Sequence, residues 1–519
     1  MQKIYYVVFF LIFSLWGQAQ ERFLDPMFNV EVETSVPYGN NISILTGAPL
    51  PQDLVMDVYT PMDDTNTSRP VILIAHTGSF LPPLFNGGIT GATTDSTTVV
   101  LCRELASRGY VAIAYTYRLG WLPTSPDQNV RTATLLQAAY RGIQDTRTAI
   151  RYLRRTVVED GNPLGIDPDN IGVGGVGTGG YLAMGAGTLY DFEEVTLDKF
   201  IDDVTLLPFI DSTIFGNLFG DTDAVLCTAN HPGFSSEVDF VFNMGGALGD
   251  ENWVDDGDDR EAMITGVHAT NDIFAPFTNG PVIVPTTNEF VVDVAGTHAA
   301  VSAANATGRN DGFADILNDP LRPLMEEQIT RTFPLPGTNP PVSAQLGANN
   351  FYAFETPFPE GSPWNWWDLE TLRVIVAATN DALGTSFDAD ELNEVGLQTN
   401  SDMSAEKGRA HIDTLLQLVL PRACVAFGLG CEGVLSTVDI VQHDLLVSPN
   451  PASNQFNIQV SDAVIRSVQL LDITGQVVLS QQNIDNNSHQ ISRIDLNSGI
   501  YLLNVVFDDG IQTIKVMIE

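Results

Sequence analysis

Basic residues are scarce in this chain: 24 lysines and arginines stand against 64 aspartates and glutamates, which leaves a formal net charge of −40. A field of that sign repels phosphate backbones and anionic lipid headgroups. We therefore exclude nucleic acid and acidic membranes as partners. A solvated acidic surface that keeps the protein soluble is the simplest interpretation of the excess.

Cysteines and long apolar runs are also rare. Four cysteines occur in 519 residues, and their spacing matches no zinc ligand set. Cys424 and Cys431 lie seven apart in a glycine-rich turn, which predicts a local disulfide, while Cys102 and Cys227 either pair with each other or remain buried thiols. After the first twenty residues no apolar stretch has the length of a bilayer span, so we expect no transmembrane anchor.

The first 19 residues have the pattern of a secretory signal peptide. Lys3 is followed by an apolar run from Ile4 to Trp16 and then by small residues that end at Ala19. The run is too short for a comfortable membrane span. Cleavage after Ala19 would deliver the mature chain to an oxidising compartment, which agrees with the expected disulfide.

The chain is too long for one compact domain. Between residues 54 and 418 apolar strands alternate with helical segments, which predicts an α/β domain with a mostly parallel sheet wrapped by helices. The strands indicated by the pattern are residues 54–61, 70–75, 111–120, 170–176, 238–245, 262–269 and 289–295. Long insertions follow the helix near residue 185 and again residue 299, and we expect them to form a cap.

Two helices and an aromatic segment bear on how this domain packs. A helix expected over residues 133–158 has one apolar stripe, and its arginines, from Arg141 to Arg155, are interpreted as a solvated or salt-bridging face. A last helix over residues 404–418 is expected to close the domain. Residues 351–367 are rich in phenylalanine and tryptophan; packing is their default interpretation, and a platform for a sugar or polymer is the alternative.

Composition changes after about residue 436. Residues 445–519 contain no cysteine and many short alternating apolar runs separated by turns, which predicts a small all-β sandwich of about seven strands. The expected domains are a signal peptide over residues 1–19, an α/β domain over 20–434, a linker over 435–444 and the β-sandwich.

The stretch Asn170–Gly185 (NIGVGGVGTGGYLAMG) has the pattern of a strand, a glycine-dense turn and a small-residue helix. It resembles a nucleophile elbow, in which α/β-hydrolases hold their catalytic serine within G-x-S-x-G. In the register from Gly175 to Gly179, the serine position is occupied by Gly177. Glycine adopts the positive φ of such a turn without strain, so we expect the turn to persist without the nucleophilic oxygen.

Residues of about 50–430 resemble secreted α/β-hydrolases of the carboxylesterase and lipase type. The segment His76–Phe80 (HTGSF) stands where that family has its His-Gly-Gly-Gly-Phe oxyanion loop, with a threonine in place of one glycine. The resemblance implies that backbone N–H groups at Gly78, Ser79 and Thr178 face a developing oxyanion.

In this family an acid and then a histidine follow the serine along the chain. Asp272, which precedes a Pro-aromatic pair, resembles the family's acid segment. His298 follows the next apparent strand, where the resemblance places the histidine, and we prefer it to His268 and His411. Asp272 and His298 are thus the expected remainder of a triad.

Four motifs in residues 445–519 occur in the order found in the C-terminal sorting domains (type A) of proteins exported by the type IX secretion system. They are Pro449-Asn450-Pro451, Asp472-x-x-Gly475, Gly499-Ile500-Tyr501 and the terminal strand from Lys515 to Ile518. The resemblance implies export by the type IX machinery, removal of this domain, and release from the cell or attachment to its surface.

Three interpretations of function remain open. The first is a hydrolase-fold protein that is inactive as a serine esterase and binds an ester, lipid or glycan ligand; we favour it because Gly177 has no side chain. The second is an active carboxyl-ester hydrolase with another nucleophile. The third is a structural surface protein stabilised by calcium, since Asp255–Asp259, near Glu251, and Asp221–Asp223 offer oxygen ligands without EF-hand spacing. No other cofactor is indicated.

Overall fold

The computed structural model describes residues 20–519 except 256, 285–286, 339, 436–442, 444, 472–476, 494–495, 508–510 and 519. The chain divides into two compact units, Met1–Leu435 and Ser436–Glu519. The expected signal peptide, most of the expected linker and the Asp472–Gly475 motif lie outside the described residues.

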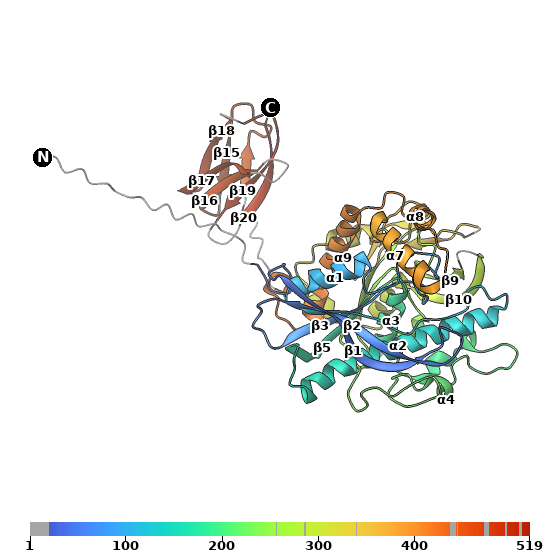
Figure 1. The fold of residues 1–519 in the computed structure, drawn as a ribbon. Coiled ribbons are helices and arrows are strands. Elements are labelled where there is room, and N and C mark those ends of the chain that lie inside the picture. Colours follow the sequence, from blue (N-terminus) through green and yellow to red (C-terminus); the bar gives the residue numbers. More distant parts are fainter. Residues whose placement is uncertain are drawn as a thin grey trace. The chain divides into compact units, whose positions relative to one another are not determined.

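An eight-stranded sheet forms the centre of the first unit (Figure 1), with the order β1-β2-β4-β3-β5-β6-β8-β13. β2 is antiparallel to β1 and to β4, and the strands from β4 to β13 run parallel. The bounds are β1 Val30–Ser43, β2 Leu50–Pro61, β3 Arg69–Ala75, β4 Val111–Tyr115, β5 Ile166–Val176, β6 Phe240–Met244, β8 Met263–Ala269 and β13 Phe351–Phe354. The mostly parallel sheet confirms the predicted fold class.

Helices cover both faces of this sheet (Figure 1). Alternate residues of a strand point to opposite faces, so Val71 and Leu73 of β3 pack in the core beneath α2 and α3, whereas Ile72 and Ile74 pack in the core beneath α1 and α9. The helices are α1 Ser96–Ser107, α2 Gln128–Glu159, α3 Thr178–Thr188, α4 Ser212–Phe215, α5 Thr297–Ala306, α6 Arg322–Ile329, α7 Leu369–Leu383, α8 Ala389–Gln398, α9 Ala405–Ala426 and α10 Glu432–Leu435.

Three of the α2 arginines that the sequence analysis assigned to a solvated face are buried. Arg147 and Arg151 are 0% and 1% exposed. Arg147 donates to the carbonyl of Leu218 at 3.1 Å, and Arg151 donates to the carbonyl of Asn230 at 2.9 Å. Carbonyl oxygens accept hydrogen bonds from both guanidinium groups, although Arg147 Nε has no partner among the described residues. The insertion between α3 and β6 is thereby held against α2 by its own backbone. Arg141 is buried in the same way.

The strand predicted at residues 289–295 is present as β10, but its expected place in the parallel sheet is wrong, and one strand of that sheet was not predicted. β10 (Glu289–Gly296) is not part of the parallel sheet, because it pairs antiparallel with β7 (Ala247–Leu248) and with β9 (Asn279–Val284). The connection from β9 to β10 is short, and a short connection joins antiparallel strands only. The last parallel strand is instead β13, which the sequence interpretation left inside an aromatic insertion. β11 (Thr332–Pro334) and β12 (Ser343–Gln345) form a separate pair.

The far end of α9 carries the disulfide. Cys424 and Cys431 are bonded, as expected, and Cys102 and Cys227 are buried free thiols. The helix continues through Pro421 to Ala426, beyond its expected end at residue 418. Proline costs a helix one hydrogen bond, and the burial of Leu420, Ala423 and Cys424 in the core offsets that loss.

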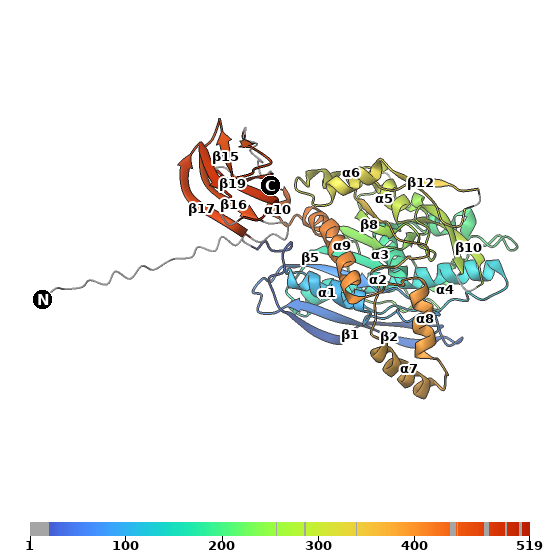
Figure 2. The ribbon, with the colours of Figure 1, turned by 90° about the horizontal axis from the view of Figure 1, so that it is seen from above.

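The second insertion forms a cap beside the loop that follows β3. Helices α7 and α8 pack against each other (Figure 2). One apolar cluster joins Leu372 and Val376 of α7 to Ala389 of α8 and to Leu84 of that loop. The cap is therefore in apolar contact with the loop after β3, four residues beyond the segment His76–Phe80 that the sequence analysis identified as the oxyanion loop.

The second unit is the all-β domain expected from the sequence. One sheet has the order β14-β15-β18 and the other β17-β16-β19-β20, and residues of both sheets share one apolar core, as in a β-sandwich. The strands are β14 Leu445–Ser448, β15 Gln455–Val460, β16 Ile465–Leu471, β17 Val477–Asn486, β18 Ser488–Ser492, β19 Gly499–Val506 and β20 Ile511–Ile518.

Candidate active site

A sharp turn joins β5 to α3, and Gly177 stands at its tip. Its φ of 53° and ψ of −118° lie in a region that side chains disfavour. A Cβ on Gly175 or Gly179 would overlap backbone atoms of Gly179 or Ala75, so neither position accepts a larger residue. These constraints fix the register of the turn and leave residue 177 as the position of a nucleophile.

The space that a side chain at residue 177 would occupy is filled by Thr77. Its Oγ1 lies 2.3 Å from the position of a Cβ on Gly177, and its Cβ lies 3.2 Å from that position. Thr77 is the residue that replaces a glycine of the oxyanion loop. The two departures from the hydrolase pattern are therefore in contact, and each fits the other.

The loop after β3 passes beside the amino end of α3. Three consecutive residues near its start, Gly78, Ser79 and Phe80, have positive φ values of 120°, 55° and 54°. The Tyr117 hydroxyl donates to the His76 carbonyl at 2.8 Å, and Trp121 Nε1 donates to the Ser79 carbonyl at 2.7 Å. These bonds hold the loop at the end of the helix that begins with Thr178, where the helix dipole favours negative charge.

Asp272 is buried in the loop after β8. Its Oδ1 accepts hydrogen bonds from the backbone N–H of Phe274 at 2.7 Å and of Ala275 at 3.3 Å. Its Oδ2 lies 3.4 Å from Nε2 of His268. Burial raises the pKa of Asp272 from 3.8 to about 7. Asp272 in turn contributes, after burial itself, to the raised pKa of Tyr181, one turn into α3.

His298, the expected triad base, lies at the start of α5, and its contacts are with residues other than Asp272. Its Nε2 is 3.4 Å from the carbonyl of Gly347, and its ring stacks on Phe277 at 5.5 Å between centroids. It lines a cavity of 610 Å³ together with Glu251, Asn279 and Ser302. The reason for choosing His298 was the strand before it, and that strand, β10, is not in the parallel sheet.

The strand that follows β8 in the sheet is β13. If acid and histidine follow consecutive strands of the sheet, as the resemblance to α/β-hydrolases implies, the histidine belongs in the loop after β13. This loop, residues 355–368 (ETPFPEGSPWNWWD), contains no histidine. It passes directly against the acid, because a Cβ on Gly361 would stand 2.5 Å from Oδ1 of Asp272. The sequence analysis missed this position because β13 is only four residues long.

The imidazole beside Asp272 belongs to a buried polar network. Nδ1 of His268 is 2.8 Å from Oγ1 of Thr297, which also accepts from Nδ2 of Asn243 at 3.0 Å and donates to the carbonyl of Gly246 at 3.1 Å. His268 is 0% exposed, and burial lowers its pKa from 6.5 to about 4. Through the bond to Gly246, the network stabilises the turn after β6.

Opposite pH dependences are expected from His268 and Asp272. Asp272 has a raised pKa in the folded state, so its contribution to stability is complete below pH 4 and is lost as the pH rises to about 7. His268 has a lowered pKa, so its contribution is complete above pH 6.5 and is lost as the pH falls to about 4. The two contributions cancel in the wild type, since folded and unfolded states each bind about one proton between these limits.

Single variants should therefore reveal the two slopes. Compared with the wild type, Asp272→Asn should gain stability as the pH rises from 4 to 7, and His268→Gln should lose stability over the same interval. Urea unfolding at several pH values measures both differences. Parallel curves for wild type and both variants would show that neither group titrates differently in the folded state.

The tryptophans of the loop after β13 contribute to packing, their default interpretation. Trp364 is 1% exposed. The Trp366 ring lies 5.6 Å from the guanidinium carbon of Arg409, and Trp367 Nε1 donates to Oδ1 of Asn393 at 2.9 Å. Trp364 is thus part of the core, and the partly buried rings of Trp366 and Trp367 are held in place by Arg409 and Asn393.

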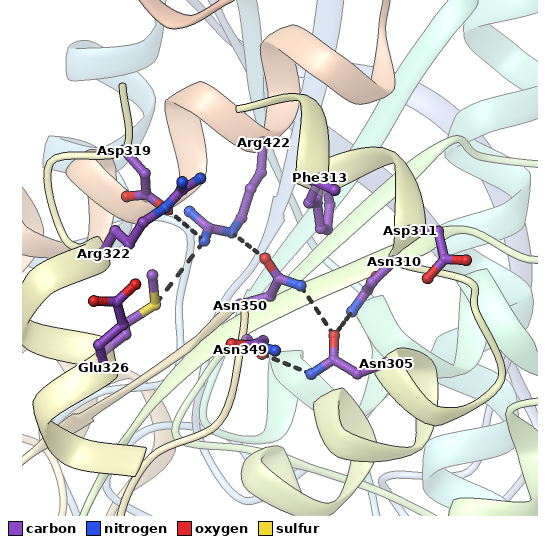
Figure 3. A pocket seen from close by; sticks show the side chains of 12 residues that line it. Asn305, Asn310, Asp311, Phe313, Asp319, Arg322, Glu326, Asn349, Asn350 and Arg422 are labelled. Atoms are coloured by element: carbon purple, nitrogen blue, oxygen red, sulfur yellow. Dashed lines mark hydrogen bonds and ion pairs between the residues drawn. The ribbon is translucent and has the colours of Figure 1, made fainter. Parts of the chain in front are cut away.

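A cavity of 640 Å³ lies near the amino ends of strands β8 and β13 (Figure 3). Asn350 directly precedes β13, and Asn310 bonds to the backbone of Ile264 near the start of β8. The side chains at the centre of this cavity bond to one another. Arg422 Nη2 lies 2.8 Å from Asp319 Oδ2, and Arg422 Nε donates to Oδ1 of Asn350 at 3.2 Å. Ligands of such sheets bind at the carboxyl ends of the strands, so we place no function here.

Two family models match parts of this chain, one in each unit. Residues 446–519 match the family described as secretion system C-terminal sorting domain. Residues 56–231, which include the turn at Gly177 and the loop after β3, match the family described as BD-FAE. No curated protein matches the chain.

Solved structures similar to this chain include esterase 2 of Thermogutta terrifontis. The form phosphorylated by paraoxon is 19% identical over 49% of this chain and 75% of that chain, with a TM-score of 0.28. The propionate-bound form is 16% identical over 69% of this chain and 97% of that chain, with a TM-score of 0.31. At these TM-scores the likeness carries no argument about the site.

Proposed function

We propose that this chain, an α/β-hydrolase-fold protein with a secretion system C-terminal sorting domain, has lost serine-esterase chemistry and binds an apolar ester or acyl ligand without cleaving it. The sorting domain directs the protein through type IX secretion to the cell surface or the extracellular space. No helix within the described part of the chain is long and apolar enough to cross a bilayer.

The observation that carries this proposal is the pair Gly177 and Thr77. A serine esterase needs an oxygen at residue 177 that a base can deprotonate. Gly177 supplies none, and Thr77 occupies the place where the side chain would stand. Two further observations support the same conclusion. Residues 355–368, which touch Asp272 at Gly361, contain no histidine, and the imidazole beside Asp272, that of His268, is fully buried and is bonded to Thr297.

An apolar ligand is supported by the loops that follow the parallel strands. The loops after β3, β4, β8 and β13 all begin at the carboxyl edge of the sheet, where ligands of α/β folds bind. Each loop exposes one large apolar side chain: Phe85, Leu122, Phe274 and Phe358. Four such side chains around one edge favour an acyl chain or an ester over a strongly charged ligand.

A second candidate, an active esterase with another nucleophile, is favoured by one observation. The Thr77 hydroxyl lies close to where a serine oxygen would stand. Against it, the neighbouring imidazole has Nδ1 2.6 Å from the Thr77 carbonyl, not from the hydroxyl, and its ring is stacked on Tyr117 at 4.4 Å. Burial also lowers the pKa of this His76 to about 4, which makes it a weak base.

Binding without turnover should be measurable with one ester. The full chain should bind p-nitrophenyl butyrate by calorimetry and release p-nitrophenol no faster than buffer alone. Phe274→Ser should weaken binding about tenfold, because it removes an aromatic contact at the edge of the sheet. Val204→Ser changes a more exposed apolar residue of the insertion between α3 and β6 and is the matched control.

Two results would contradict the proposal. If Phe274→Ser and Val204→Ser weaken ester binding equally, the binding site does not lie at the carboxyl ends of the parallel strands. Turnover by the wild type that Thr77→Ala abolishes would establish the second candidate, with Thr77 as its nucleophile.

A further inference from the structure

Carboxylates from two separate segments converge beside the amino end of β8. Asp191 and Glu194 lie at the start of the short helix Phe192–Thr196, which follows α3. Asp255 and Asp258 precede β8. One oxygen atom each from Asp191, Asp255 and Asp258 lie within 4.8 Å of one another. Such groups are common on acidic surfaces, so the convergence alone identifies no site.

Two buried oxygens beside this cluster lack a partner among the described residues. Glu261 is 6% exposed; its Oε1 accepts from the N–H of Asp255 at 2.8 Å, and its Oε2 is buried without a hydrogen bond. Glu194 Oε2 accepts from the N–H of Asp191 at 2.7 Å, and its Oε1 is likewise buried without a hydrogen bond. A buried carboxylate oxygen without a partner is costly, which points to a missing ligand.

The surrounding cations do not neutralise the cluster. Arg260 lies 2.5 Å from Asp258 and 3.5 Å from Asp191, and Arg309 donates to the carbonyl of Asp258. Two guanidiniums thus face five carboxylates.

We propose that Asp191, Asp255 and Asp258, with Glu261 and Glu194 behind them, bind a calcium ion. All donors are oxygens, which suits a hard cation and excludes the sulfur and imidazole sites of zinc. Calcium takes oxygens at about 2.3–2.6 Å, so ligand oxygens around one ion stand at most about 5 Å apart. The oxygens of Asp191, Asp255 and Asp258 meet that condition. Magnesium requires a stricter octahedron, and a secreted protein meets calcium outside the cell.

The structure extends the sequence analysis of these acidic segments. Asp255 and Asp258 belong to the stretch that the sequence marked as a source of calcium ligands, but Asp191 and Glu194 come from about 60 residues earlier. The other marked stretch serves turns instead, since Asp221 accepts from Nδ2 of Asn217 at 2.7 Å. The ion would join the segment after α3 to the segment before β8.

Calcium titration of the metal-stripped full chain tests this inference. We expect one ion to bind with a Kd on the order of 0.1–1 mM, the range of extracellular calcium modules. At about 10 mM calcium the melting temperature should rise by about 2–3 °C, and magnesium should give a smaller rise. No heat and no shift with calcium, or an equal shift with magnesium, would overturn the proposal.

Matched variants separate a metal ligand from a structural side chain. Glu261→Gln and Asp255→Asn should weaken calcium binding at least tenfold, while Glu193→Gln, an exposed neighbour of Glu194, should leave it unchanged. Without calcium, Glu261→Gln should melt no lower than the wild type, because it removes an unpaired buried carboxylate. A lower melting temperature for metal-free Glu261→Gln, with the calcium response intact, would assign Glu261 a purely structural role and overturn its part in the site.

Discussion

Gly177→Ser alone should leave ester hydrolysis at the rate of buffer. A complete triad accelerates amide or ester cleavage by about 10⁶-fold in kcat relative to its knockouts, and one serine does not recover that factor here. The new oxygen would compete with Thr77 for space, and the loop after β13 has no histidine to act as base. Initial rates with p-nitrophenyl butyrate, and the absence of labelling by a fluorophosphonate, measure the result.

The stability of the same variants tests the contact between residues 77 and 177. Gly177→Ser should destabilise the protein by about 1–3 kcal/mol, because a side chain at positive φ is strained and the threonine must move. Thr77→Gly should relieve the steric part, so the double variant should be more stable than the sum of single effects predicts, with a coupling of about 0.5–3 kcal/mol. Additive effects would show that the two residues do not share this space.

A different outcome would restore the sequence-based assignment of the base. If Gly177→Ser hydrolyses the ester and His298→Ala abolishes that activity, His298 reaches the turn in solution. If Thr77→Gly with Gly177→Ser is active while Gly177→Ser is not, steric blockage alone caused the inactivity, and the base must be sought among other groups.

Asp145→Asn should be strongly destabilising. Asp145 and Arg118 are both 0% exposed, with Arg118 Nη2 2.9 Å from Asp145 Oδ1, and the backbone N–H of Arg118 also donates to Oδ2 at 2.8 Å. Removing one charge of a buried pair leaves the other uncompensated and costs about 3–5 kcal/mol. For a domain of this size the melting temperature should fall by about 5 °C, measured by scanning calorimetry of the full chain.

The control for this prediction lies on or next to the same helix. Arg155 and Asp160 form an ion pair at 2.9 Å that is largely exposed to solvent. Exposed pairs contribute about 0–1 kcal/mol, so Asp160→Asn should shift the melting temperature by no more than about 1 °C. Similar losses for Asp145→Asn and Asp160→Asn would contradict the claim that burial makes the Arg118 pair important.

Local pattern was enough to predict the mostly parallel sheet, the β-sandwich and the disulfide. Each depends on residues that are neighbours in sequence: the apolar run of β3, the alternation in β15, and the short spacing from Cys424 to Cys431. The glycine turn at residues 175–179 was likewise visible, because its crowding is expressed as glycines within five residues.

What the pattern did not predict depends on contacts between distant segments. The end of β8 and the start of β13 are separated by 81 residues, and β13 has only four residues. Four residues are too few for a periodic signal. β10 has a longer and clearer strand pattern, so His298 was chosen over the loop after β13. The fit of Thr77 against Gly177 is invisible in the sequence, because nothing local indicates that residues 100 apart meet.

The buried arginines of α2 bear on how freely the insertion between α3 and β6 can change. Arg147 and Arg151 donate hydrogen bonds to backbone carbonyl oxygens, which every amino acid possesses. The contact therefore depends on the arginines of the helix and hardly on the side chains of the segment that they hold. Exposed residues such as Val204 and Leu207 are thereby released from holding the fold together. Most substitutions of exposed residues in this segment should therefore leave the protein folded. The surface of the segment can change in sequence while the residues of α2 stay the same.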